Sequence, residues 1–283
     1  MKEALLILFV ILFVWNIIMI LFKKIKRIKK VTKEIKIFNI GSSHGLCSFN
    51  YKYTRKYKNS SYNFGWHSQT FYYDYLVLKN YFNKISRDGI CFIPISYFSF
   101  SSKKRWEKAD FIYEKTLKFY LLEGEDRKRA FILQYLPLYV SIRKRIIKFL
   151  FESKKQLKKK TGIERIKKHV EILETQNEKE SLLQLEKIIE LLLIKNIKVV
   201  LITTPFKKEY NDFFSEELLN KNFYDNIKII KNQYKLIYID FSHEYRIFNQ
   251  EKYFLDYDHL SEEGSKIFMQ ELKKQLKKEG IEI

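Results

Sequence analysis

The pattern of apolar and polar positions opens with one long apolar run. Residues 4–22, ALLILFVILFVWNIIMILF, contain no charged residue and a single amide, that of Asn16. As a helix, the run would be roughly 28 Å long, about the thickness of the hydrocarbon layer of a membrane. It is apolar on every face, unlike a core helix with one buried stripe. It also lacks the short apolar region and small-residue cleavage site of a signal peptide. We therefore expect one uncleaved transmembrane anchor.

The charges that flank this run bear on its orientation. Residues 23–30, KKIKRIKK, follow it directly, whereas only Lys2 and Glu3 precede it. The positive-inside rule therefore favours a cytoplasmic position for residues 23–283.

Five short apolar runs rich in β-branched residues follow the anchor. They cover residues 35–40, 61–65, 90–96, 197–204 and 236–241. Between them lie stretches with helical periodicity, most clearly residues 69–85 and 178–196. Strands that alternate with helices predict a parallel sheet covered on both faces, in an α/β domain.

The interval 101–196 contains no obvious strand. Within it, residues 139–160 place Ile146, Ile147 and neighbouring apolar residues among many lysines and arginines. This pattern fits a helix on an anionic membrane surface, or a lid over a site. It also fits an ordinary helix with one stripe facing a core, which is the interpretation that we prefer.

The last helix has clear start and stop signals. Ser261 can cap it, Glu262 and Glu263 lie in its first turn, and lysines crowd its end before Gly280. No internal repeat or low-complexity linker divides the chain. We expect an anchor with a basic segment at residues 1–34, and one domain at residues 35–283 with a helical insertion at about 101–196.

The formal net charge of +21 narrows the range of partners. It favours anionic ones such as phospholipid head groups, acidic glycans or nucleic acid, unless the lysines simply cover solvated faces. No helix-turn-helix, zinc or aromatic RNA-binding signature accompanies the charge, so we expect no nucleic-acid partner. Cys47 and Cys91 lie far apart and form neither a metal-spaced pair nor a disulfide framework.

Candidate chemistry begins where the first predicted strand ends, in GSSHG at residues 41–45. A glycine there permits a sharp turn, which would put Ser43 at the start of the following helix. Ligands of open α/β sheets bind beyond the carboxyl ends of the strands. Backbone N–H groups at such a helix start can stabilise a developing oxyanion.

A serine nucleophile needs a base, and the base needs an orienting carboxylate. Residues 254–265, FLDYDHLSEEGS, offer Asp256 and His259 three residues apart, just before the last helix. In one turn of loop, the carboxylate can reach Nδ1 of the imidazole and leave Nε2 free to face a serine.

Together the two motifs resemble the SGNH (GDSL-type) hydrolases and acyltransferases. The resemblance covers about residues 35–283 and implies a flavodoxin-like three-layer α/β/α fold with a mainly parallel five-stranded sheet. It implies Ser43 as nucleophile, Asp256 as orienter and His259 as general base. The usual Gly-Asp-Ser of the family reads Gly41-Ser42-Ser43 here.

The family's middle motifs are only partly present. Asn63 and Gly65 of NFGWHS match the second one, and its final glycine falls on Ser68. The asparagine expected after the third strand is missing, and Ser96 is the nearest polar substitute. The expected oxyanion donors are therefore Ser43, Ser68 and Ser96. One missing donor typically costs a factor of about 10² to 10³ in rate, which leaves slow activity or a catalytically degenerate protein as alternatives.

The resemblance implies a membrane-anchored serine esterase or O-acyltransferase acting on ester-linked acyl groups of a cell-envelope glycan or lipid. That role would put the domain outside the cytoplasm, against the basic flank. The alternative is a degenerate SGNH-fold envelope protein with a structural or binding role. We expect no cofactor and no metal, because His67, His169 and His243 have no partner at metal-ligand spacing. His44 should point roughly 100° away from Ser43 on a helix.

Overall fold

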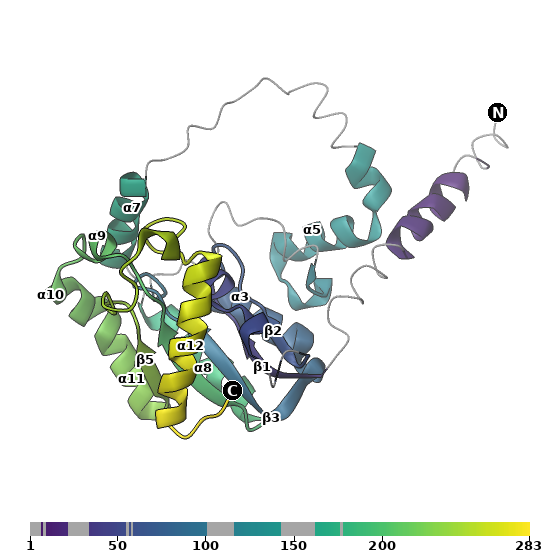
Figure 1. Ribbon diagram of the computed structural model, residues 1–283. Helices are drawn as coiled ribbons and strands as arrows, with labels where there is room; N and C mark the ends of the chain where they lie inside the picture. Colours follow the sequence, from purple (N-terminus) through teal and green to yellow (C-terminus); the bar gives the residue numbers. More distant parts are fainter. Residues whose placement is uncertain are drawn as a thin grey trace. The chain divides into compact units, whose positions relative to one another are not determined.

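The chain folds into two compact units. Figure 1 shows the computed structural model, which describes residue 7 and residues 10–21, 34–54, 57, 59–100, 116–142, 162–175 and 178–283. The first unit joins residues 1–32 to residues 110–159, and the second joins residues 33–109 to residues 160–283. The predicted insertion 101–196 is thus divided between the two units.

The second unit is built on five parallel strands in the order β2-β1-β3-β4-β5. They are β1 (Ile35–Asn39), β2 (Ser61–Asn63), β3 (Ile85–Pro94), β4 (Lys198–Thr203) and β5 (Ile237–Asp240). Each strand overlaps one of the five apolar runs, so the predicted parallel sheet is confirmed. The order is the flavodoxin-like one, in which ligands bind beyond the carboxyl ends of β1 and β3.

β3 begins five residues before the apolar run that predicted it. Its first half contains the polar residues Ser86, Arg87 and Asp88, and Asp88 has a left-handed φ of +55°. The pairing with β1 shifts register between Ile35 and Ile37. A Cβ atom on Gly89 would lie 2.5 Å from the carbonyl oxygen of Lys36, so this close approach requires glycine.

Helices cover both faces of the sheet (Figure 1). One layer holds α2 (Ser43–Ser48) against α12 (Glu262–Lys278), and in the other α8 (Glu178–Leu193) contacts α3 (Phe71–Tyr81) and α11 (Asp225–Tyr234). The helices predicted over 69–85 and 178–196 and at the end of the chain are confirmed.

The main core lies between the sheet and α12. Phe268 and Leu272 of α12 share one buried cluster with Phe92 and Val200 of the central strands. Neighbouring residues of a strand point to opposite faces, so Cys91 and the other alternate residues face the second helical layer. This alternation explains why the central strands read as continuous apolar runs.

The start of α12 is capped as predicted. The Ser261 hydroxyl accepts a hydrogen bond from the Gly264 N–H at 3.1 Å, and Glu262 and Glu263 lie in the first turn. Two further helices are α5 (Gly124–Tyr135) and α7 (Gly162–Glu174). Shorter elements include η1 (Tyr51–Tyr53), η2 (Phe82–Lys84), η3 (Phe119–Leu121), α9 (Lys208–Asn211), α10 (Glu216–Leu219), the π-helical η4 (Asn220–Tyr224) and η5 (Glu251–Tyr253).

The first unit contains the predicted anchor. Residues 10–21 are helical, and the rest of the run 4–22 lies outside the described residues except for Ile7. Among the described residues, no helix has both the length and the hydropathy needed to cross a membrane. The structure therefore gives no support to the single span, which stays a prediction. The helix predicted over 139–160 lies outside the described residues beyond Ile142.

Candidate active site

The first predicted motif lies where β1 ends. Gly41 has a φ of +103°, which residues with a side chain rarely adopt, and a Cβ atom there would lie 3.2 Å from Cδ of Pro94. The Gly41 N–H donates to Oδ1 of the buried Asp74 at 2.7 Å, which fixes the turn. Ser43 is consequently the first residue of α2, beyond the carboxyl end of β1.

The second predicted motif meets the first. His259 Nε2 lies 2.7 Å from Ser43 Oγ, and His259 Nδ1 lies 2.9 Å from both carboxylate oxygens of Asp256. The structure thus brings the three predicted catalytic residues into one continuous chain of hydrogen bonds. With Nδ1–H donating to Asp256, the lone pair of Nε2 faces the serine hydroxyl.

The loop that carries Asp256 and His259 is held by its own hydrogen bonds. Asp256 Oδ1 accepts from the backbone N–H of Asp258 at 3.1 Å and from that of His259 at 2.9 Å. The Leu255 N–H donates to the His259 carbonyl at 2.8 Å. These bonds set the orientation of the carboxylate and imidazole independently of any ligand.

Arg165 of α7 contacts both acidic residues of this loop. Its Nη1 lies 2.8 Å from Asp256 Oδ2, and its Nη2 pairs with Oδ1 of the buried Asp258. Burial by itself would raise the pKa of Asp256, but hydrogen bonds from His259 and Arg165 outweigh burial and hold that pKa well below its usual range. Asp256 is therefore ionised at neutral pH.

A second histidine–aspartate pair lies beside the first. His44 Nε2 lies 3.0 Å from Asp258 Oδ2, and both side chains are buried. The ring centroids of His44 and His259 are 5.0 Å apart. Burial lowers the pKa of His44 although the bond to Asp258 opposes this, so His44 is neutral at neutral pH. Burial by itself would raise the pKa of Asp258, but the hydrogen bond from His44 and the electrostatic effects of the neighbouring histidines together outweigh burial and lower that pKa.

His169 of α7 completes the group. Its Nδ1 lies 3.0 Å from the Tyr210 hydroxyl and 3.9 Å from Asp258 Oδ2, and burial lowers its pKa to about 4. Because His44 and His169 are neutral at neutral pH, Arg165 is the cation that balances Asp256 and Asp258 among the described residues. Asp256, Asp258 and Arg165 together therefore carry one net negative charge.

Sequence reasoning missed much of this network. Spacing offers no reason to include His44 or His169, yet both contact Asp258. Two signals were present, since His44 directly follows Ser43 and Asp258 directly precedes His259. Arg165 is 91 residues from Asp256, and no local pattern marks it.

The predicted oxyanion donors are placed differently. Ser43 N–H lies in the first turn of α2, where backbone N–H groups have no acceptor within the helix. Ser68 is exposed and has a left-handed φ of +55°, a conformation typical of the glycine expected there. Ser96 is buried, and its N–H already donates to Ser99 Oγ at 2.8 Å. All three roles stay predictions.

Asn63, which matches the family's second motif, fastens β2 to α2. Its amide nitrogen donates to the carbonyls of Gly45, Leu46 and Phe49 at 3.1, 3.1 and 2.9 Å. Its Oδ1 accepts from Asn39 Nδ2, and from Gly65 N–H at 2.8 Å. The hydrogen-bonding capacity of this side chain is filled by protein groups, so its role here is structural.

His44, Asp258 and His259 form the one group of possible metal ligands among the described residues, with donor atoms within 4.8 Å of one another. The donors of Asp258 and His259 are already engaged: Asp258 binds His44 and Arg165, and His259 binds Ser43 and Asp256. A metal ion would have to compete with the guanidinium of Arg165 for Asp258. These residues therefore fit a hydrogen-bonded network better than a metal centre.

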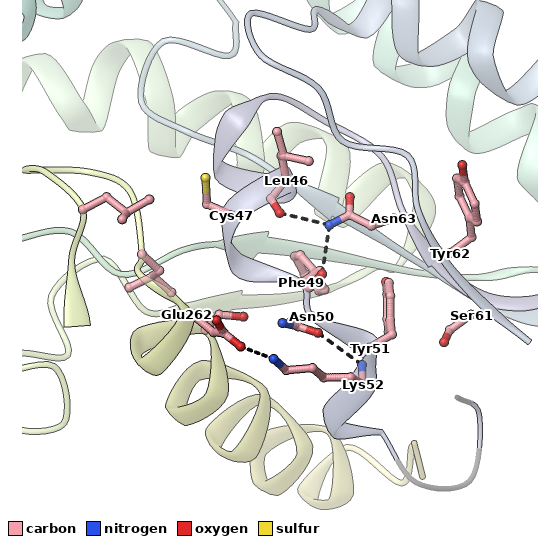
Figure 2. Close-up of a pocket in the computed structure, with 13 residues that line it drawn as sticks. Leu46, Cys47, Phe49, Asn50, Tyr51, Lys52, Ser61, Tyr62, Asn63 and Glu262 are labelled. Atoms are coloured by element: carbon pink, nitrogen blue, oxygen red, sulfur yellow. Dashed lines mark hydrogen bonds and ion pairs between the residues drawn. The ribbon is translucent and has the colours of Figure 1, made fainter. Parts of the chain in front are cut away.

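A cleft of about 670 Å³ is lined by residues from the end of α2, from η1 and β2, and from the start of α12 (Figure 2). Cys47, one helical turn after Ser43, lines it together with Leu255 and Leu260, which flank the loop of His259. Burial raises the pKa of the Cys47 thiol. Neither Ser43 nor His259 lines this cleft, so it adjoins the site without containing it.

Comparisons with known proteins are sparse. No protein-family model matches the chain, and no curated protein matches it. Among solved structures, a proposed acylhydrolase from Bacteroides fragilis is similar, with 13% identity, a TM-score of 0.42, and coverage of 89% of this chain and 93% of that one. A GDSL-like lipase from Bacteroides thetaiotaomicron has 12% identity, a TM-score of 0.43, and coverage of 87% and 88%. Similarity at this level carries no argument about activity, which has to be inferred from the site.

Proposed function

We propose that the second unit is a serine esterase or O-acyltransferase of the SGNH (GDSL) type, held at a membrane by residues 4–22. The observation that carries this proposal is the chain of hydrogen bonds from Ser43 through His259 to Asp256. The flavodoxin-like strand order supports the family, as does the position of the two motifs after β1 and before α12. The 2.7 Å contact between Ser43 and His259 suits direct proton transfer.

In the proposed reaction, Ser43 Oγ attacks the ester carbonyl carbon while His259 Nε2 accepts the hydroxyl proton. Backbone N–H groups at the start of α2 stabilise the negative charge on the tetrahedral intermediate, and Asp256 stabilises the imidazolium. His259 then gives the proton to the departing alcohol, which leaves the acyl group on Ser43. Water or a sugar hydroxyl, deprotonated by His259, attacks the acyl-enzyme and regenerates Ser43.

The proposed substrate is an ester-linked acyl group of a cell-envelope glycan or lipid. The net charge of +21 suits an anionic polymer or lipid surface. Small acyl groups such as acetyl or D-alanyl are what the family resemblance implies.

The alternative is a protein that keeps this fold and has lost catalysis. Its support is the site around Ser96, where the expected asparagine is absent and the Ser96 N–H is occupied by Ser99. Loss of one oxyanion donor lowers the rate by about 10²- to 10³-fold, so a site that is otherwise intact would still be active.

Labelling with a fluorophosphonate probe tests the proposal. We expect the wild-type chain to be labelled, Ser42→Ala to keep the label, and Ser43→Ala to lose it. Hydrolysis of a short-chain aryl ester should be abolished by Ser43→Ala and by His259→Ala. The double variant should be little worse than either single one, because the residues act as a unit. Labelling that persists in Ser43→Ala would refute the nucleophile, and an unlabelled, inactive wild type would favour the degenerate alternative.

A further inference from the structure

Exposed apolar side chains are concentrated in the first unit. Among the described residues, 23 large apolar side chains are exposed, and 16 of these belong to the first unit, although it supplies far fewer described residues than the second. Ten of them lie on residues 7–21 and six on residues 120–142. This concentration is far above the scatter of single apolar residues normal for a protein surface.

The helix over residues 10–21 is exposed all round in its first half, and in its second half only Asn16, Met19 and Ile20, which share one face, are half-buried. Every residue from Val10 to Trp15 is an exposed large apolar residue, and Trp15 has 55% of its surface exposed. Successive residues of a helix are about 100° apart, so six in a row surround the axis completely. A protein partner would bury one stripe of such a helix, whereas hydrocarbon solvates every side. The distribution therefore favours lipid as the surrounding medium.

Residues 130–142, AFILQYLPLYVSI, form a second uncharged run in the same unit. The basic triplet RKR borders it on both sides, at residues 127–129 and 143–145. An apolar stretch of this length is too short to span a bilayer and is typical of an interfacial or re-entrant element. Basic residues at its borders complement anionic head groups. Phe131, with 46% of its surface exposed, and Tyr139, with 52%, are among the apolar side chains that it exposes.

Asn16, the one polar residue of the anchor, pairs with this second run. The helical run is interrupted between Tyr135 and Pro137, and proline has no N–H to continue the hydrogen-bond ladder. The Asn16 amide nitrogen donates to the Tyr135 carbonyl at 2.7 Å, and its Oδ1 accepts from the Leu138 N–H at 3.4 Å. The Asn16 amide thus satisfies one backbone carbonyl and one backbone N–H where the helix is interrupted.

Two other polar side chains of the run are also satisfied within the unit. Gln134 donates to the Leu117 carbonyl at 2.7 Å, and Ser141 donates to the Pro137 carbonyl at 2.8 Å. Water would satisfy such groups on an ordinary surface without any help from the protein. In hydrocarbon each unpaired group costs several kcal/mol, so internal pairing is what a lipid-exposed element requires.

We propose that residues 130–142 are a second membrane-embedded element, seated against the anchor helix through Asn16 and exposing Phe131 and Tyr139 to lipid acyl chains. This surface is independent of the ester chemistry proposed for the second unit. The protein would then hold to the bilayer at two points of its sequence rather than one.

The experiment places a fluorophore on residue 139 of the full-length chain. The parent is Cys47→Ser, in which the buried Cys91 stays unreactive. Tyr139→Cys carries an environment-sensitive label, and Leu183→Cys on α8 is the matched control, because Leu183 is 48% exposed. Both proteins are reconstituted into vesicles of phosphatidylcholine and phosphatidylglycerol, with and without bromine on the acyl chains.

We expect brominated lipid to quench the label at residue 139 several-fold more than the label at residue 183. The same result should follow for Phe131→Cys, so that one poorly tolerated label does not decide the outcome. Equal quenching at residues 131, 139 and 183 would overturn the proposal and leave a protein partner or water as the surroundings of the run.

Asn16→Leu tests the pairing itself. The variant makes the anchor more apolar, so the chain should still resist extraction from membranes by carbonate. The label at residue 139 should lose much of its quenching, because the run is no longer held against the anchor. Unchanged quenching in Asn16→Leu would overturn the role of Asn16.

Discussion

Removing the charge of Arg165 probes the candidate active site most directly. Arg165→Met keeps an unbranched side chain but leaves Asp256 and Asp258 facing His259 without their counter-ion. An additional net negative charge stabilises the imidazolium form of His259. Only the imidazole form can accept the proton of Ser43, so the variant should need a higher pH to react.

The size of this effect follows from the distances in the site. Asp256 Oδ2 lies 2.8 Å from Arg165 Nη1 and 2.9 Å from His259 Nδ1, which puts the guanidinium within about 6 Å of the imidazole. At that separation, two unit charges interact by about 2.8 kcal/mol for an effective dielectric constant of ~20. The Arg165 side chain is 33% exposed, and screening by solvent reduces the effect to about 1.4 kcal/mol. That free energy corresponds to a shift of about one pH unit.

The measurement is kcat/KM for a short-chain aryl ester between roughly pH 5 and 9, because this parameter reports groups of the free enzyme. The acidic limb of the profile for Arg165→Met should move up by about one unit, and activity on the alkaline side should approach that of the parent. Arg165→Lys keeps the charge and should leave the limb near its original position. Adding Asp258→Asn to Arg165→Met removes one charge of each sign, so the limb should return towards the parent.

Three results would count against this reasoning. A uniform loss of kcat/KM with an unmoved acidic limb would mean that Arg165 only holds α7 against the loop of His259. A limb that moves to lower pH would contradict the sign of the charge argument. Failure of Asp258→Asn to restore the limb would show that Arg165 acts on His259 by something other than cancelling the charge of Asp258.

Three further predictions concern the framework around Ser43. Burial raises the pKa of Asp74 to about 7, above its value of 3.8 in the unfolded chain, so the contribution of Asp74 to the free energy of unfolding falls as pH rises between about 4 and 7. The contributions of His44 and His169, whose pKa values burial lowers, rise with pH in the same range. The free energy of unfolding of Asp74→Asn, measured relative to the parent by urea denaturation at several pH values, should therefore increase with pH. Asn63→Asp turns the donor that serves three carbonyls into an acceptor and should cost about 3 kcal/mol in urea denaturation. A loss below about 1 kcal/mol would contradict its fastening role. Gly41→Ala should lower thermal stability by about 1–3 kcal/mol and reduce ester hydrolysis, because φ of +103° is strained for alanine. Unchanged hydrolysis would show that this turn does not position Ser43.

The sheet was predictable because its strands are buried on both faces. Continuous apolar runs separated by helical periodicity leave few alternatives to a parallel α/β sheet, and all five runs are strands. The start of β3 was not predictable, because a polar stretch with Asp88 in a left-handed conformation pairs with β1 there through close backbone contact. Such pairing depends on the neighbouring strand, so the pattern of apolar and polar residues within this stretch does not predict it.

The division into two units could not be predicted from the sequence either. Residues 110–159 group with residues 1–32, and this association depends on contacts such as Asn16 with Tyr135, across 119 residues. Local composition marks both segments as apolar and basic, but it cannot say that they pair. The helices α7 and α8, in contrast, fold with the sheet although they lie in the same strandless interval.

Some contacts of the candidate site could be predicted from local sequence, and others depend on residues that only the fold brings together. Adjacent residues of α2 meet adjacent residues of the loop before α12: Ser43 contacts His259, and His44 contacts Asp258. Once the first contact is predicted, the second is its geometric neighbour, so the buried His44–Asp258 pair was within reach of the sequence. Two carboxylates beside one imidazole then require a cation, since a buried uncompensated charge is costly. The sequence could have shown that requirement, but with 54 lysines and arginines in the chain only the fold selects Arg165 to meet it.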